Sequence, residues 1–144
     1  MKKKKHLLLI MLIILVSGIS LSGCASINDT VGGIFAPVGV TMTYPENGAT
    51  GVSTNIVVKA SFNEAVNALS FNSRTFLLFG PGNKQVKGKV YYNPNSLTNY
   101  IATFTPLEPL KPNTTYRAVL TTGVTGNLKQ HLSHNYSWKF TTGN

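Results

Sequence analysis

The stretch that decides the fold lies near the end of the chain and reads Tyr136-Ser137-Trp138-Lys139-Phe140-Thr141-Thr142. Large apolar side chains alternate here with polar ones, and a period of two is typical of a β-strand that is buried on one face only. The same alternation occurs at 56–62 and at 115–121. These segments are therefore predicted to be strands with one face toward a core and the other toward solvent.

Working outward from these three segments, we find seven runs rich in Val, Ile, Thr, Tyr and Phe between residue 38 and the end of the chain. The expected strands are 39–44, 56–62, 75–79, 86–92, 99–105, 115–121 and 136–142. Turn sequences separate them, such as Pro-Glu-Asn-Gly at 45–48, and none of the seven prolines falls inside a run. Because each strand has one apolar face, we expect an all-β domain, a seven-stranded antiparallel β-sandwich.

The N-terminal segment has a different composition. Four lysines at positions 2–5 precede an uninterrupted apolar run at 7–16, and small residues follow. This order is typical of a secretory signal peptide. The apolar run is too short to span a bilayer, which takes about 20 residues.

The signal ends in Leu21, Ser22, Gly23 and Cys24, which resembles the bacterial lipobox. The resemblance implies cleavage before Cys24, whose thiol then carries a diacylglyceryl group that anchors the chain. An ordinary signal peptide with a buried free cysteine is the alternative. Residues 1–23 are then a lipoprotein signal peptide, and 24–37, rich in small and polar residues, form a lipidated N-terminus and flexible tether.

The resemblance also bears on localisation. Position 25 is Ala, whereas Asp after the cysteine tends to hold diderm lipoproteins in the inner membrane. The expected location is the outer membrane in a diderm bacterium, or the outer face of the cytoplasmic membrane in a monoderm one.

Composition limits the function. Removing 23 residues and four lysines from a chain of 144 residues with 13 basic and 4 acidic side chains leaves 121 residues and a net charge of +5. That charge, without an arginine cluster and outside the cytoplasm, argues against nucleic acid as a partner. One cysteine allows no internal disulfide, and four carboxylates are too few to favour a paired-carboxylate hydrolase.

Catalytic and metal-binding patterns are weak as well. No Gly-x-Ser-x-Gly elbow occurs, and the acidic residues fall in the tether or in turns. His131 and His134 lie three apart in a loop, but a zinc ion needs at least a third protein ligand. We therefore interpret both as solvated loop residues, and we expect no enzymatic activity and no cofactor.

Several segments of the domain together resemble the bacterial Ig-like domain of surface-layer and envelope proteins. They are Tyr44-Pro45-Glu46-Asn47-Gly48-Ala49 with Val52, Phe62-Asn63-Glu64-Ala65-Val66, Phe104-Thr105-Pro106 leading to Leu110, and Trp138-Lys139-Phe140-Thr141-Thr142-Gly143. The resemblance implies that 38–144 is an Ig-like or fibronectin type III-like sandwich. The segment 110–116 also resembles a tyrosine corner, in which the hydroxyl of Tyr116 would bond to nearby backbone.

One cluster is a candidate ligand patch. Lys87, Lys89 and Tyr91 fall on one face of the expected strand 86–92, with Lys84 just before it. They are suited to anionic or sugar-bearing polymers, but lysines on an edge strand also discourage aggregation between sheets. Both interpretations stay open at this point.

The expected function is a lipid-anchored cell-envelope protein whose single Ig-like domain serves as a structural, adhesion or protein-interaction module. The expected partners are the membrane, through the lipid on Cys24, and another envelope or host protein. A polysaccharide-binding module is the second hypothesis, and an accessory subunit of an envelope enzyme or assembly is the third.

Overall fold

A computed structural model describes residues 36–95 and 99–144. Eight strands and two short 3₁₀ helices make up this part of the chain. They are β1 (Val40–Tyr44), β2 (Ala49–Val52), β3 (Val58–Phe62), η1 (Ala68–Ser70), β4 (Phe76–Phe79), η2 (Pro81–Asn83), β5 (Gly88–Tyr92), β6 (Ile101–Pro106), β7 (Thr115–Leu120) and β8 (Tyr136–Thr142). The signal peptide, the lipobox and nearly all of the tether lie outside the described residues.

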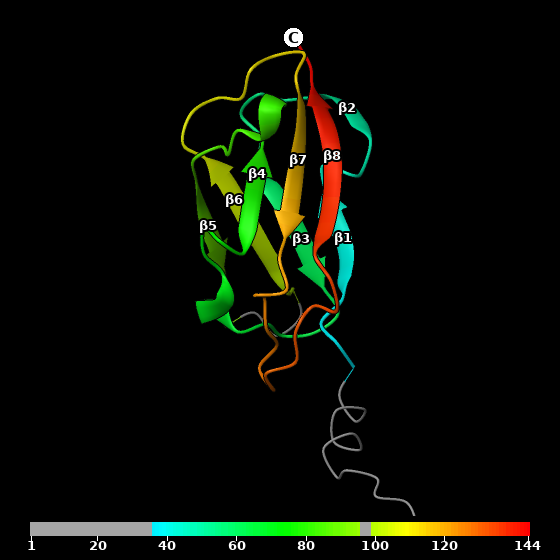
Figure 1. The fold of residues 1–144 in the computed structure, drawn as a ribbon, viewed down its shortest axis with the longest axis vertical. Coiled ribbons are helices and arrows are strands. Elements are labelled where there is room, and N and C mark those ends of the chain that lie inside the picture. Colours follow the sequence, from blue (N-terminus) through cyan, green and yellow to red (C-terminus); the bar gives the residue numbers. More distant parts are fainter. Residues whose placement is uncertain (1–35, 96–98) are drawn as a thin grey trace, which may run out of the picture. The chain divides into compact units, whose positions relative to one another are not determined.

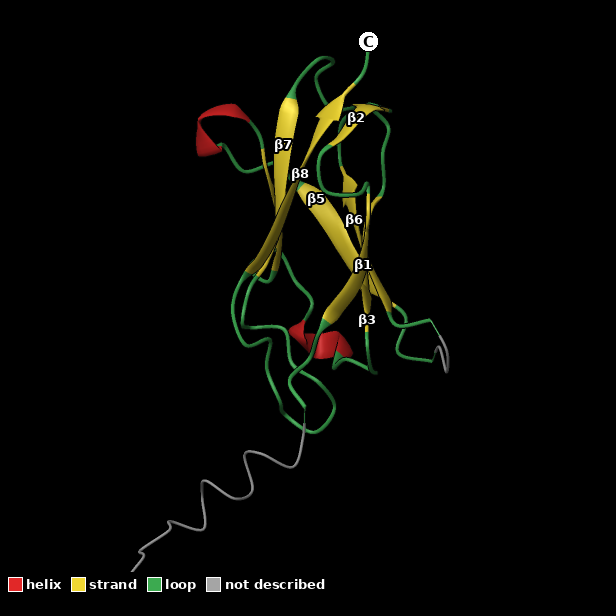
Figure 2. Cartoon of the chain, turned by 90° about the vertical axis from the view of Figure 1, so that its right-hand side faces the viewer, coloured by secondary structure: helices red, strands yellow, loops and turns green. Residues whose placement is uncertain are grey.

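The strands form two four-stranded sheets, in the orders β1-β3-β6-β5 and β2-β8-β7-β4. Figure 2 shows them as two layers facing each other, and Figure 1 shows the second sheet in front of the first. The all-β sandwich is therefore confirmed. No helix among the described residues is long and apolar enough to cross a membrane.

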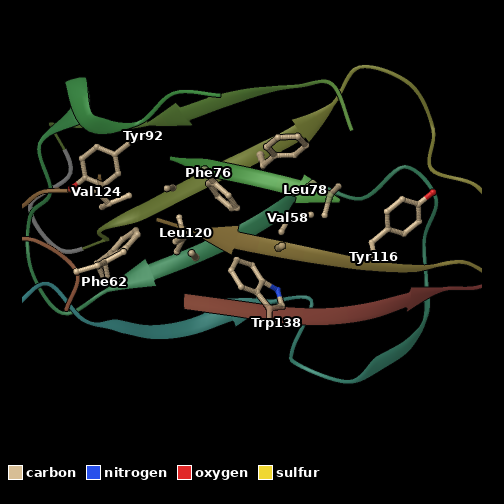
Figure 3. Close-up of a cluster of buried hydrophobic side chains, with 14 of the residues drawn as sticks. Val58, Phe62, Phe76, Leu78, Tyr92, Tyr116, Leu120, Val124 and Trp138 are labelled. Atoms are coloured by element: carbon tan, nitrogen blue, oxygen red, sulfur yellow. The ribbon is translucent and has the colours of Figure 1, made fainter. Parts of the chain in front are cut away.

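The core lies between the two sheets and is filled by the residues that alternation assigns to it. Val58, Ala60 and Phe62 of β3 are buried, as are Trp138 and Phe140 of β8. Figure 3 shows rings and aliphatic side chains from both sheets meeting in this layer. Removing such apolar surface from water contributes about 25 cal/mol per Å² to stability.

Three details differ from the sequence-based expectation. There are eight strands rather than seven, because the short strand β2 was not expected, and it pairs parallel to β8. Pro106 is the last residue of β6, although no proline was expected within a strand. Alternation over 115–121 predicts Val119 on the outer face of β7, but Val119 is buried, with Leu77 and Ser137 as its cross-strand neighbours.

The missed strand has a physical reason. Residues 49–52 read Ala-Thr-Gly-Val, which is short and lacks an apolar alternation. Gly51 takes a positive φ of 66°, and the register with β8 shifts between Ala49 and Val52. Local sequence therefore carries little strand signal, and it is the pairing with β8 that makes the segment a strand.

Candidate functional site

The sequence-predicted patch lies on an edge strand. β5 is the last strand of the sheet β1-β3-β6-β5, and Lys87 directly precedes it. Lys87, Lys89 and Tyr91 are all exposed, whereas Gly88 and Val90 between them are partly buried. The structure thus brings the three predicted residues together on the outer side of β5. This position is compatible both with a ligand patch and with protection of the sheet edge against aggregation.

β5 approaches its neighbour closely at Gly88. A Cβ atom built on Gly88 would lie 2.3 Å from Cζ of Phe104 and 2.9 Å from the carbonyl oxygen of Thr105. No side chain fits there, so a glycine is required between the two lysines. In the same strand pair, Lys89 lies opposite Thr105 of β6.

The same surface continues across the whole sheet. Tyr44 of β1 pairs with Lys59 of β3, Lys59 pairs with Thr103 of β6, and Thr103 pairs with Tyr91 of β5. Residues directly opposite each other in a sheet point to the same face. We call Tyr44, Lys59, Thr103 and Tyr91 the cross-strand row. Alternation over 56–62 predicts that Lys59 lies on the outer face of its strand, but no local pattern connects it with Tyr44 or Tyr91.

The row has an exposed aromatic ring at each end and a cation beside one of them. Tyr44 is 55% exposed and Tyr91 is 62% exposed. The Nζ atom of Lys59 lies 5.8 Å from the centroid of the Tyr44 ring, a cation–π distance. The hydroxyl of Thr103 donates a long hydrogen bond, 3.4 Å, to the carbonyl oxygen of Tyr91.

The carboxylates of the described residues come from loops and not from the strands of this sheet. Glu46 and Glu108 are exposed residues of the loops after β1 and β6. Glu64 follows β3, and its Oε2 atom accepts a hydrogen bond of 2.7 Å from Nε2 of Gln130, in the loop before β8. Lys59, Lys87 and Lys89 therefore give the outer surface of this sheet a positive potential, which draws anions more strongly at low ionic strength.

A hollow of about 500 Å³ adjoins the patch at one end of the sandwich. Lysines 84, 87 and 111 and Glu108 contribute charged groups to its lining, and Leu110 and Tyr116 contribute buried apolar surface. Lys87 thus borders both the hollow and the outer face of β5.

Tyr116 forms the tyrosine corner that the sequence predicts. Its hydroxyl oxygen accepts a hydrogen bond of 2.9 Å from the backbone N–H of Lys111. Thr142 of β8 ties the same segment down, since its hydroxyl donates to the carbonyl oxygen of Lys111 at 2.6 Å. At the other end of the core, the hydroxyl of Tyr92 accepts from the N–H of Val66 at 3.0 Å. Figure 3 shows the two tyrosines at opposite ends.

The two loop histidines are exposed and have separate contacts. Nδ1 of His131 lies 2.9 Å from the carbonyl oxygen of Thr122, and Nδ1 of His134 lies 2.8 Å from the hydroxyl of Ser133. In the part of the chain that the structure describes, no three His, Cys, Asp or Glu side chains gather closely enough to hold a metal ion. Cys24 lies outside this part.

A two-layer sandwich with a tyrosine corner at the start of β7 defines the class of protein: an Ig-like β-sandwich domain. The family model described as bacterial Ig-like domain matches residues 36–142, so the chain belongs to that family. No curated protein is significantly similar to it in sequence.

Solved structures with the same fold include very different proteins. Domains 1–6 of the surface layer protein SbsC share 17% identity with this chain at a TM-score of 0.56, and the alignment covers 75% of this chain and 14% of that one. PcoC, a methionine-rich copper resistance protein from Escherichia coli, shares 17% identity at 0.59, with coverages of 74% and 99%. CopC from Methylosinus trichosporium OB3b shares 12% identity at 0.60, with coverages of 74% and 93%.

These similarities establish the fold alone. At such low identity, different functions occur on one sandwich architecture, so function has to be argued from the surface of this chain. The chain also spans only a small part of the SbsC structure, 14% of its length.

Proposed function

We propose that this protein is exported, lipid-anchored at Cys24, and presents its single Ig-like domain as a non-catalytic adhesion or protein-interaction module of the cell envelope. The observation that carries the proposal is the extent of the family match. Residues 36–142 belong to one Ig-like domain, which occupies nearly all of the 121 residues that follow the expected cleavage site. Binding is therefore assigned to the surface of that domain.

The anchor is tested with a single variant. Cys24→Ala removes the thiol that would carry the lipid, so the protein should no longer incorporate labelled palmitate and should leave the membrane fraction. Ser26→Ala, two positions further on, is the matched control and should behave like the wild type. Palmitate incorporation by the Cys24→Ala variant would exclude acylation at this position.

Exposure of the domain is tested by adding protease to intact and to lysed cells, with a cytoplasmic protein as the control. Cleavage on intact cells supports contact with host proteins or external polymers. Protection until lysis supports an internal envelope partner. Release of an unlipidated, freely diffusing protein in either case would contradict an anchored module.

A second candidate function is polysaccharide binding. It is favoured by the exposure of Lys87, Lys89 and Tyr91 together on β5. The double variant Lys87→Gln and Lys89→Gln should fold normally, because both side chains are exposed, and should bind an anionic polymer more weakly. If polymer binding is unchanged while light scattering shows new aggregation, the two lysines protect a sheet edge instead.

A further inference from the structure

We propose that the outer surface of the sheet β1-β3-β6-β5 binds an acidic polysaccharide that lies across the strands, with sugar rings against Tyr44 and Tyr91 and acidic groups against Lys59 and Lys89. This inference rests on the proposed function as a binding module and names its ligand class and surface. It extends the patch predicted on β5 to the opposite edge of the sheet.

The register of the sheet places two exposed tyrosines in one row. The cross-strand row runs without a gap through all four strands, from Tyr44 at one edge to Tyr91 at the other. Neighbouring strands lie about 4.8 Å apart, so three steps place the two tyrosines roughly 14 Å from each other. Two exposed rings at that separation on one sheet face can contact two sugar rings of the same chain.

Polar side chains lie between the two tyrosines. Between the two tyrosines lie Lys59 and Thr103, and Ser61 pairs with Met42 in the next row. The cross-strand row is therefore polar between its two aromatic rings, whereas Met42 and Ile101 flank Ser61 in the next row. Protein interfaces have the reverse arrangement, an apolar centre with a polar rim. Hydroxyl and ammonium groups between two rings suit a ligand that carries hydroxyl groups along its whole length.

The charged side chains that the strands of this sheet present are lysines. Lys59 and Lys89 project from the sheet, and Lys87 lies just before β5. The described carboxylates Glu46, Glu64 and Glu108 lie in loops outside the strands of this sheet. A ligand with carboxylates complements this potential, whereas a neutral glycan offers Lys59 and Lys89 no counter-charge.

The experiment compares four probes on the full chain purified in a neutral detergent. Polygalacturonate carries sugar rings and carboxylates, its methyl ester keeps the rings without the charge, and inorganic polyphosphate keeps charge without rings. Vesicles of phosphatidylglycerol test a membrane surface. We expect polygalacturonate to bind at least about tenfold more tightly than each of the others, with affinity falling as salt is raised.

Variants then locate the surface. Tyr44→Ala and Tyr91→Ala should each weaken binding of polygalacturonate about fivefold, and Lys59→Gln about threefold with a flatter salt dependence. Tyr44→Phe keeps the ring and should retain most of the affinity. Lys139→Gln, on an exposed position of the opposite sheet, is the matched charge control and should bind like the wild type.

Each other outcome overturns the inference. Equal binding of polyphosphate or of vesicles would mean that charge alone acts, and equal binding of the methyl ester would mean that charge is irrelevant. Unchanged affinity in Tyr44→Ala, with folding verified by the fluorescence of buried Trp138, would place the ligand elsewhere. None of these results affects the palmitate and protease tests, so the envelope proposal can stand when the polysaccharide inference fails.

Discussion

Replacing Tyr116 by Phe removes one oxygen atom from the tyrosine corner and leaves the rest of the side chain in place. The ring is 4% exposed and stacks against Phe140 with centroids 5.9 Å apart, so this packing is retained. What is lost is the acceptor for the N–H of Lys111. The variant therefore isolates a single hydrogen bond that fixes the loop before β7.

The expected cost follows from that geometry. A hydrogen bond contributes about 1 kcal/mol net, and leaving its partner unsatisfied costs about 1–3 kcal/mol when that partner is buried. The Lys111–Tyr116 bond is only part-buried, so we expect a value between these limits. The free energy of unfolding should fall by about 1.5 kcal/mol. With an m-value of about 1.5 kcal/mol/M in urea, the unfolding midpoint should fall by roughly 1 M.

The assay is equilibrium unfolding in urea followed by the fluorescence of Trp138, the only tryptophan of the chain and 1% exposed. Tyr92→Phe is the positive control, because it also loses a buried hydroxyl acceptor, that for Val66. Tyr44→Phe is the exposed control and should change the midpoint by less than about 0.3 M. If Tyr116→Phe is no less stable than Tyr44→Phe, the hydroxyl does not hold the corner and the reasoning is wrong.

Two further predictions concern the close contact at Gly88 and the hydrogen bonds that hold the segment before β7. Gly88→Ala should lower the free energy of unfolding by about 1–3 kcal/mol, because the added Cβ would collide with the Phe104 ring. Equilibrium unfolding in urea tests this prediction. A variant as stable as the wild type would contradict the close contact. Thr142→Val keeps the shape but removes the hydroxyl that donates to Lys111, and should cost about 2 kcal/mol, more than Tyr116→Phe. A calorimetric midpoint equal to that of the wild type would refute this second prediction.

Alternation in the sequence predicted most of the sandwich because it reports a local property, the direction of each side chain. It assigned Val58, Ala60 and Phe62 to the core, where the structure has them. It did not predict the parallel pairing of β2 with β8, because the two segments are some ninety residues apart and β2 has little strand signal of its own.

The candidate surface could also be predicted from the sequence only within a single strand. Lys87, Lys89 and Tyr91 lie in one strand, and the period of two sufficed to place them on one face. Tyr44 lies 47 positions before Tyr91, and only the register of three strand pairs puts them in one row. Register depends on tertiary packing and bulges, such as the one between Val40 and Met42, which no local pattern encodes.

The parallel pairing of β2 with β8 determines how the domain responds to a stretching force. The described chain begins at one end of the sandwich and ends at the other, and β2 and β8 run in the same direction between them (Figure 1). A pull between the two ends drags these strands past each other lengthwise. The bonds from the N–H of Gly48 to the carbonyl of Lys139, and from the N–H of Gly143 to the carbonyl of Val52, then bear load together. Because these two bonds have to break together, we expect the pairing of β2 with β8 to resist such a pull better than a pair of strands that opens one bond at a time.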